Sequence, residues 1–169
     1  VQIGLNYILN KTGINPSSLT HSLIYWFLII SFSEEFFKYL VVKVKVTNNP
    51  VLDEPLDIML YMVIAALGFT AVENILYLFS PVGQMSLDQI IDRTLIIALI
   101  RFVGATFLHT LCSAIVGYAM AVSFFDQKNT KREVVYGIII AVVLHGLYDF
   151  SIMTLGGNIK LIIPMIIIL

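Results

Sequence analysis

The chain has 169 residues, of which 59% are hydrophobic and only 12% are charged. Soluble domains average about 45–50% apolar and about 25% charged residues, so this composition indicates an integral membrane protein with the lipid bilayer as its partner. The formal net charge of −1 offers no basic surface to phosphates and excludes nucleic acid as a partner. The only cysteine, Cys112, excludes an internal disulfide.

Four apolar segments are long enough to cross a bilayer, which takes about 20 residues. These segments are residues 19–46, 56–79, 94–125 and 134–155. The sequence therefore predicts an all-α transmembrane bundle of four full spans, in a single membrane domain over residues 1–169. The terminal apolar run, 159–169, is too short to span alone and is expected to be a partial segment. Because the chain starts at Val1 and ends inside this run, we expect the domain to be the core of a longer protein.

Polar connectors separate these segments. Residues 43–55 and 126–133 together carry five Lys and Arg residues, against three (Lys11, Arg93 and Lys160) near the opposite ends of the segments. Since cytoplasmic loops are enriched in Lys and Arg, both connectors are predicted to be cytoplasmic. Residues 86–93 are predicted to form a polar connector before the third span.

Every predicted span carries polar or ionisable side chains at membrane depth. They are Glu34, Glu35 and Lys38 in the first, Glu73 and Asn74 in the second, Arg101 and His109 in the third, and His145 and Asp149 in the fourth. A charge near the bilayer centre costs roughly 2.5–3.5 kcal/mol, so such groups persist where they face one another or a wet cavity. We therefore expect all four helices to contribute to one buried, hydrated pocket.

Spacing along each helix suggests which groups form pairs. Glu34 and Lys38 are four residues apart with the acid first, which favours an ion pair. Asp149 lies four residues after His145 and can hold one imidazole nitrogen. For Arg101 two interpretations remain open, because it can balance the charge of Glu73 or extend to a lipid headgroup.

Four sequence blocks occur in order along the chain. They are EExxK at Glu34–Lys38, FxxxEN at Phe69–Asn74, Arg101 followed by His109 and Gly117, and HxxxD at His145–Asp149. Together they resemble the PrsW family of intramembrane proteases, which is related to the CAAX prenyl proteases and the bacteriocin-immunity-type membrane proteases. The resemblance covers residues 31–150.

The resemblance implies an endopeptidase in the bacterial cytoplasmic (inner) membrane. It implies membrane-anchored substrates such as anti-sigma factors, and catalytic positions at Glu34, Glu35, His109 and His145. Glu73 stands where the CAAX-protease pattern has a histidine, so an imidazole oxyanion donor does not carry over to this position.

Two enzymatic mechanisms remain open from the residues. In the first, which needs no cofactor, Glu35 is the general base on water and Glu34 pairs with Lys38. His109 or His145, with Asn74 nearby, then polarises the scissile carbonyl.

The second mechanism adds zinc. The candidate ligands are Glu73, His109 and His145, completed by Glu35 or Asp149. A third hypothesis is not enzymatic, since the same polar cluster suits an ion or proton pathway or the interior of a membrane scaffold.

Overall fold

The computed structural model describes residues 19–47, 49, 52–78, 86–125, 130–155 and 164–167. Within these ranges the chain is helical with short connections and no strand, which confirms the all-α prediction. The elements are α2 (Leu19–Leu23), η1 (Ile24–Ser31), α3 (Phe32–Lys45), α4 (Pro55–Leu78), α5 (Leu87–Ile100), η2 (Arg101–Ala105), α6 (Thr106–Phe125) and α7 (Thr130–Thr154), where η denotes π-helix. A further helical turn covers residues 164–167.

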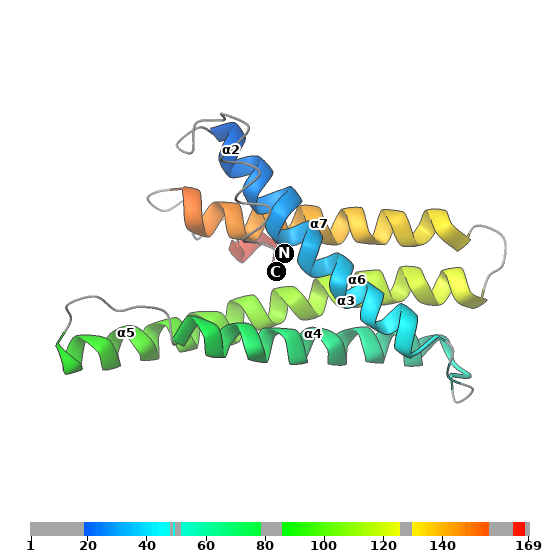
Figure 1. Ribbon diagram of the computed structural model, residues 1–169, viewed down its shortest axis with the longest axis horizontal. Helices are drawn as coiled ribbons and strands as arrows, with labels where there is room; N and C mark the ends of the chain where they lie inside the picture. The colour runs from blue at the N-terminus through cyan, green and yellow to red at the C-terminus, as the bar shows by residue number, and fades with distance from the viewer. Residues whose placement is uncertain are drawn as a thin grey trace.

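Consecutive elements join into two long rods. One rod comprises α2, η1 and α3, and the other comprises α5, η2 and α6. Helix α6 packs between α4 and α7, and the first rod crosses these helices obliquely (Figure 1). The crossing brings η1 against α7 and α3 against α4, α6 and α7, so all four helical units meet near the middle of the bundle.

Among the residues that the structure describes, three helices are long enough and apolar enough to cross a membrane. They are Pro55–Tyr77, Arg101–Phe125 and Lys131–Thr154. The predicted fourth span, residues 19–46, forms a continuous helix over 19–45 but is not confirmed as a span, because α3 carries five charged side chains in its sequence FSEEFFKYLVVKVK. The expected partial span at 159–169 lies mostly outside the described residues.

The third helix starts earlier than the sequence predicted. Residues 86–93 were expected to form a connector, but α5 begins at Leu87 and continues into η2 and α6. The cause is a reciprocal cap, because the backbone N–H of Ser86 donates to Gln89 Oε1 at 3.1 Å and the N–H of Gln89 donates to Ser86 Oγ at 3.4 Å. This capping box satisfies backbone donors that the first turn leaves without partners.

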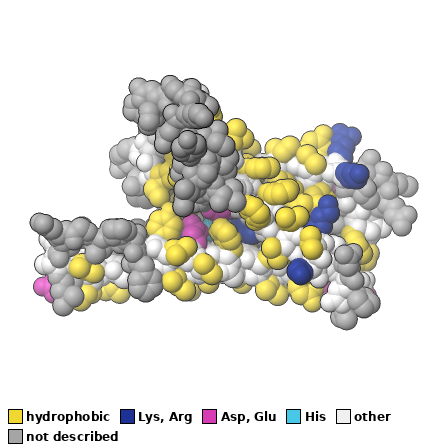
Figure 2. Space-filling view, in the orientation of Figure 1, with side chains coloured by type: hydrophobic (Ala, Val, Ile, Leu, Met, Phe, Trp, Pro, Cys, Tyr) yellow, Lys and Arg dark blue, Asp and Glu magenta, His cyan; other side chains and the backbone are white. Residues whose placement is uncertain are grey.

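Close helix contacts form at glycines that lie against a neighbouring helix. An added Cβ at Gly117 would lie 2.9 Å from Met59 Cα, and one at Gly137 would lie 2.6 Å from Ala119 Cβ. Gly117 therefore brings α6 against α4, while Gly137 brings α7 against α6. Large hydrophobic side chains remain exposed on the outside of the bundle, as expected where lipid is the solvent (Figure 2).

Candidate active site

A π-helical segment immediately precedes α3 in the first rod and α6 in the second. The first, η1, packs against α7, and the second, η2, which contains Arg101, contacts α7 at Gly104. Phe27 of η1 fills the space beside Gly146, where an added Cβ would lie 2.6 Å from the ring. The Tyr148 hydroxyl lies against Gly104 of η2 in the same way. A π-helical turn changes the rotation of the helix that follows it, and such turns occur frequently at functional sites. The two contacts therefore set how α3 and α6 present their polar side chains to α7.

Glu35 is the most deeply enclosed carboxylate of the cluster. Its side chain is fully buried, and Oε1 accepts hydrogen bonds from Lys38 Nζ at 2.6 Å and from His145 Nδ1 at 2.8 Å. The sequence predicted that Lys38 would pair with Glu34, but the ion pair that the structure forms from Lys38 is with Glu35. Spacings of three and four residues both place side chains on one helix face, so α3 alone did not decide between the two carboxylates.

His109 lies between Lys38 and Glu73. Lys38 Nζ is 3.1 Å from Nδ1 of the imidazole, and Glu73 Oε2 is 3.1 Å from Nε2. An ammonium group only donates, so Nδ1 accepts and the ring proton lies on Nε2, where it is donated to Glu73. These two contacts hold the ring from opposite sides.

Arg101 binds three neighbours on α4. Its Nη2 is 2.9 Å from Glu73 Oε2, its Nε donates to Asn74 Oδ1 at 2.9 Å, and its guanidinium lies 3.6 Å from the ring centroid of Tyr77. The prediction that Arg101 balances the charge of Glu73 is confirmed. The guanidinium thereby restrains the carboxylate that binds His109.

Acceptor atoms converge on the outer nitrogen of His145. Its Nδ1 donates to Glu35, while Nε2 faces Asp149 Oδ2 at 3.3 Å and Glu34 Oε2 at 3.7 Å. The predicted contact between His145 and Asp149 is therefore confirmed. A neutral ring with its proton on Nδ1 would point a lone pair at two carboxylates, so the arrangement calls for a proton or a cation among the three groups: a second ring proton, a protonated carboxyl group or a metal ion.

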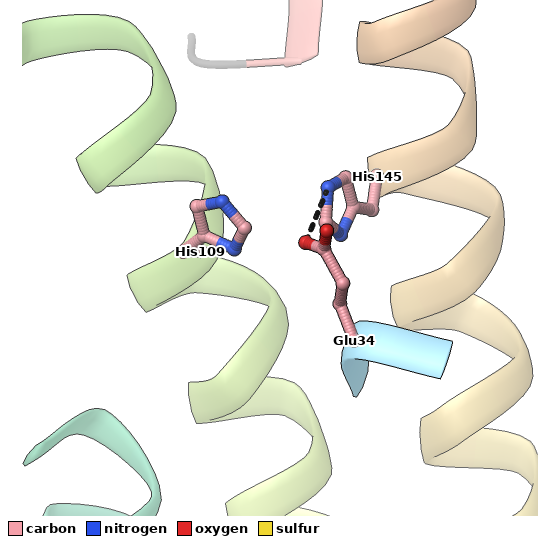
Figure 3. A group of neighbouring side chains, drawn as sticks. All are labelled: Glu34, His109 and His145. Atoms are coloured by element: carbon pink, nitrogen blue, oxygen red, sulfur yellow. Dashed lines mark ion pairs between the residues drawn. The ribbon is translucent and has the colours of Figure 1, made fainter. Parts of the chain in front are cut away.

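The two imidazoles and Glu34 form one compact group. Glu34 rises from α3 between His109 on α6 and His145 on α7 (Figure 3). The rings lie edge to face with centroids 4.7 Å apart, and one ligand atom from each of the three residues lies within 4.8 Å of the other two. Two imidazoles and a carboxylate are a donor set that catalytic zinc accepts, with a fourth position left for water or substrate.

This donor set fits a metal ion in a second respect. Metal-binding histidines usually donate their other ring N–H to a carboxylate, and His145 does so to Glu35. Zinc bonds of about 2.0–2.2 Å would require the three ligand atoms to draw closer together. His109 would also have to exchange its contact with Lys38 or with Glu73 for the metal, because both of its ring nitrogens are engaged in the structure. Of the zinc ligands expected from the sequence, His109 and His145 belong to this group, and Glu73 contacts it through His109. The third member is Glu34, which the sequence did not suggest as a zinc ligand.

A cavity of about 730 Å³ lies beside this group, between the first rod and α4. Its walls are largely aromatic and aliphatic, and its charged lining residues are Glu34, Lys38, Glu73 and Asp149. Acidic side chains are visible among hydrophobic ones on this face of the molecule (Figure 2). The cavity therefore connects the buried polar cluster with an apolar surface.

Comparison with known proteins identifies the family. The model of a family described as "PrsW family intramembrane metalloprotease" matches residues 1–169. The chain belongs to the PrsW family. With its three apolar helices, this PrsW family member is an integral membrane protein.

Curated relatives agree with the family match. Protease PrsW of Clostridioides difficile (strain 630) is 30% identical over 129 residues, which are 75% of this chain and 51% of the relative. Protease PrsW of Shouchella clausii (strain KSM-K16) is 30% identical over 144 residues, 85% of this chain and 61% of the relative. The chain thus spans about half to three-fifths of the length of these relatives. No solved structure matches it significantly.

The structure brings all the polar residues singled out from the sequence into one connected cluster. Two aromatic residues also take part in it: Phe69, which the sequence singled out only as the first residue of the FxxxEN block, and Tyr77, which was not expected there. The centroid of the Phe69 ring lies 5.5 Å from Lys38 Nζ and 5.7 Å from the centroid of the His109 ring. Phe69 and Tyr77 each lie four residues from Glu73, so helical spacing could have indicated both. Nothing in the sequence indicates the packing of Phe27 on Gly146.

Proposed function

We propose that this PrsW family protein hydrolyses a peptide bond of a membrane-anchored protein within the bilayer. The observation that carries the proposal is the convergence of Glu34, His109 and His145 beside a largely apolar cavity. As the substrate class we propose membrane-anchored regulators of the anti-sigma-factor type, which the family resemblance implies.

We further propose that Glu34, His109 and His145 hold a divalent cation. The support is the family description as metalloproteases, together with the acceptor atoms that converge on Nε2 of His145. Zinc bound there would polarise a peptide carbonyl and make a water molecule more acidic.

The remaining side chains have distinct parts in this mechanism. Asp149 lines the cavity beside His145 and is the carboxylate placed to take a proton from the attacking water and pass it to the leaving amine. Glu35 and Lys38 hold the two imidazoles in orientation. Arg101 restrains Glu73, which in turn binds His109.

A metal-free alternative has its own support. In this mechanism His145 carries a second proton instead of a metal, and Glu34, at the cavity, is the general base. Glu35 was first expected in that role, but its Oε1 already accepts hydrogen bonds from Lys38 and His145. Asp149 would then only orient His145. The two mechanisms differ in what they require of the metal and of Asp149.

One experiment tests the activity and the mechanism together. Full-length protein is purified, reconstituted in liposomes and incubated with tagged single-span anti-sigma factors, with cleavage followed by mass spectrometry. We expect cleavage by the unmodified protein, about one equivalent of metal by elemental analysis, loss of activity on chelation and recovery with zinc. Full activity in metal-free protein would overturn the metal proposal. Asp149→Asn should then lower cleavage less than the metal mechanism requires, because Asp149 would only orient His145.

A second outcome addresses the non-enzymatic hypothesis. If the unmodified protein binds the tagged anti-sigma factors but cleaves none of them with or without zinc, a scaffold role is favoured. The proteolytic proposal would be wrong for that substrate class.

The membrane orientation is also a proposal. Lys43 and Lys45 at the end of α3 and Lys131 and Arg132 at the start of α7 are exposed at the same end of the bundle (Figures 1 and 2). By the positive-inside tendency this end faces the cytoplasm of the bacterial inner membrane. Labelling of a single cysteine introduced at Lys45 should therefore require a membrane-permeant reagent.

A further inference from the structure

Gly68 differs from the other glycines that the structure describes in helices. Gly104, Gly117, Gly137 and Gly146 each lie against a neighbouring helix so closely that a Cβ would collide with it. An added Cβ at Gly68 meets nothing within 4 Å in the described part of the chain. Glycine weakens a helix interior relative to alanine, so a glycine without a packing role inside α4 calls for another reason.

Gly68 lies on the wall of the cavity beside the polar cluster. Ala65 and Val72 line the same wall at intervals of three and four residues, so α4 presents a stripe of short side chains there. Phe69, Leu76 and Tyr77 of the same helix line the cavity beside this stripe. The facing wall carries larger groups, including Trp26 and Phe37 of the first rod. The space over Gly68 is thus bounded by aromatic side chains and adjoins the carboxylates.

The cavity also reaches the outer surface of the helices. Leu76 and Val72 on α4 are 65% and 59% exposed, and Val41 on α3 is 56% exposed. Leu76 and Val72 lie on α4, which is apolar enough to cross the bilayer, so these exposed side chains face acyl chains. The cavity is therefore open sideways towards lipid, between the first rod and α4.

We propose that this cavity is a lateral groove for the membrane segment of the substrate, in which a bulky uncharged side chain occupies the space over Gly68. The inference rests on the proposed proteolytic function and names the part of the substrate that the site recognises. A volume of about 730 Å³ lies within the range of about 300–1,000 Å³ that is typical of ligand pockets. Three carboxylates against one ammonium group in the lining disfavour an acidic side chain in the bound segment.

The first test fills the space over Gly68. Gly68→Leu should lower kcat/KM for the cleaved anti-sigma-factor reporter about tenfold or more, mainly through KM, because a side chain has been placed where the substrate binds. Ala71→Leu is the matched control, since Ala71 is exposed on α4 outside the cavity lining. Replacing the large apolar residues of the reporter's membrane segment by alanine, one at a time, should identify one position that restores cleavage by the Gly68→Leu variant.

The second test measures contact without activity. The only cysteine of this chain, Cys112, is replaced by alanine together with any cysteine elsewhere in the protein, and Glu34→Gln removes cleavage. Gly68→Cys should then form a disulfide with a reporter that carries one cysteine in its membrane segment, whereas Ala71→Cys should not. This measurement also covers the case in which Gly68→Leu fails to fold.

The outcomes separate this inference from the proposed function. Cleavage by unmodified protein with equal crosslinking at both positions would overturn the groove and leave proteolysis standing. Crosslinking confined to Gly68→Cys without any cleavage by unmodified protein would support the groove and overturn proteolysis. Unchanged kinetics of a folded Gly68→Leu variant would overturn the groove. The space over Gly68 would then hold a lipid chain, or no group that is required for cleavage.

Discussion

Two neighbouring glutamates divide the site into two regions. The closed region consists of Glu35 and Nδ1 of His145, whose atoms are almost completely buried, and Lys38 joins it to the cavity, which the lysine side chain also lines. The open region consists of Glu34, Glu73 and Asp149, whose side chains line the cavity. One peptide bond separates Glu34 from Glu35, yet a helix rotation of about 100° per residue directs them to different surroundings. Identical carboxylates therefore serve different purposes, since one orients an imidazole and the other meets the substrate.

The largest effect is expected from the open region. Glu34→Gln keeps the shape of the side chain but removes a carboxylate, so cleavage of the reporter should fall about 10³-fold with little change in the free energy of unfolding. Glu35→Gln should instead destabilise the protein, because Lys38 loses its buried partner. Activity assays and SDS unfolding of both variants test the division. Equal effects of the two substitutions on both quantities would abolish the distinction.

Loss of the buried ammonium group is expected to have the next largest effect. Lys38→Met leaves the Glu35 carboxylate enclosed without its ion-pair partner and should lower the free energy of unfolding by about 3–5 kcal/mol. The combined Lys38→Met, Glu35→Gln variant should be more stable than Lys38→Met alone. Lys43→Met is the control on the exposed face of α3, with an expected change within about 0.5 kcal/mol. A stable Lys38→Met protein would show that water reaches the closed region.

Arg101 sharpens the comparison because it supports the open region from outside. Arg101→Met should reduce both metal affinity and cleavage about 10–100-fold, since Glu73 loses the group that restrains it beside His109. Arg101→Lys should not restore them, because an ammonium group cannot bind Glu73 and Asn74 in the same planar geometry. Metal titration distinguishes this effect from simple destabilisation, and Arg132→Met, at an exposed arginine, is the control.

The smallest effects concern two glycines, one on α7 packed against the first rod and one on α4 at the cavity. Gly146→Ala should destabilise the protein by about 1–3 kcal/mol, because the new methyl group would meet Phe27 at 2.6 Å. Gly68→Ala should be neutral or stabilising by up to about 1 kcal/mol, because its Cβ enters open space. Thermal unfolding in detergent compares the two variants. The same loss of stability in both would indicate that Gly68 is packed as Gly146 is.

Spacing along one helix predicted one of two ion pairs correctly, while the predicted ion pair between helices, Arg101–Glu73, is confirmed. The pair His145–Asp149 is confirmed because one turn of a helix brings the two side chains together. The pair Glu34–Lys38 had the same spacing, but Lys38 binds Glu35, because Glu35 also receives His145 from α7. Spacing determines which partners a side chain can reach, while the neighbouring helices determine which partner it binds.

The composition and order of residues by themselves determined that this is an all-helical membrane protein of the PrsW type whose polar side chains must meet. Burying charges in lipid is so costly that only convergence is tolerated. The tertiary structure alone decided that Glu34 faces the cavity, that Glu35 is enclosed, and that Gly68 borders open space. Those outcomes depend on how each rod is rotated against α7. This rotation is set by the two π-helical segments and by the contacts of Phe27 with Gly146 and of Tyr148 with Gly104. The regular periodicity of an α-helix does not predict either effect.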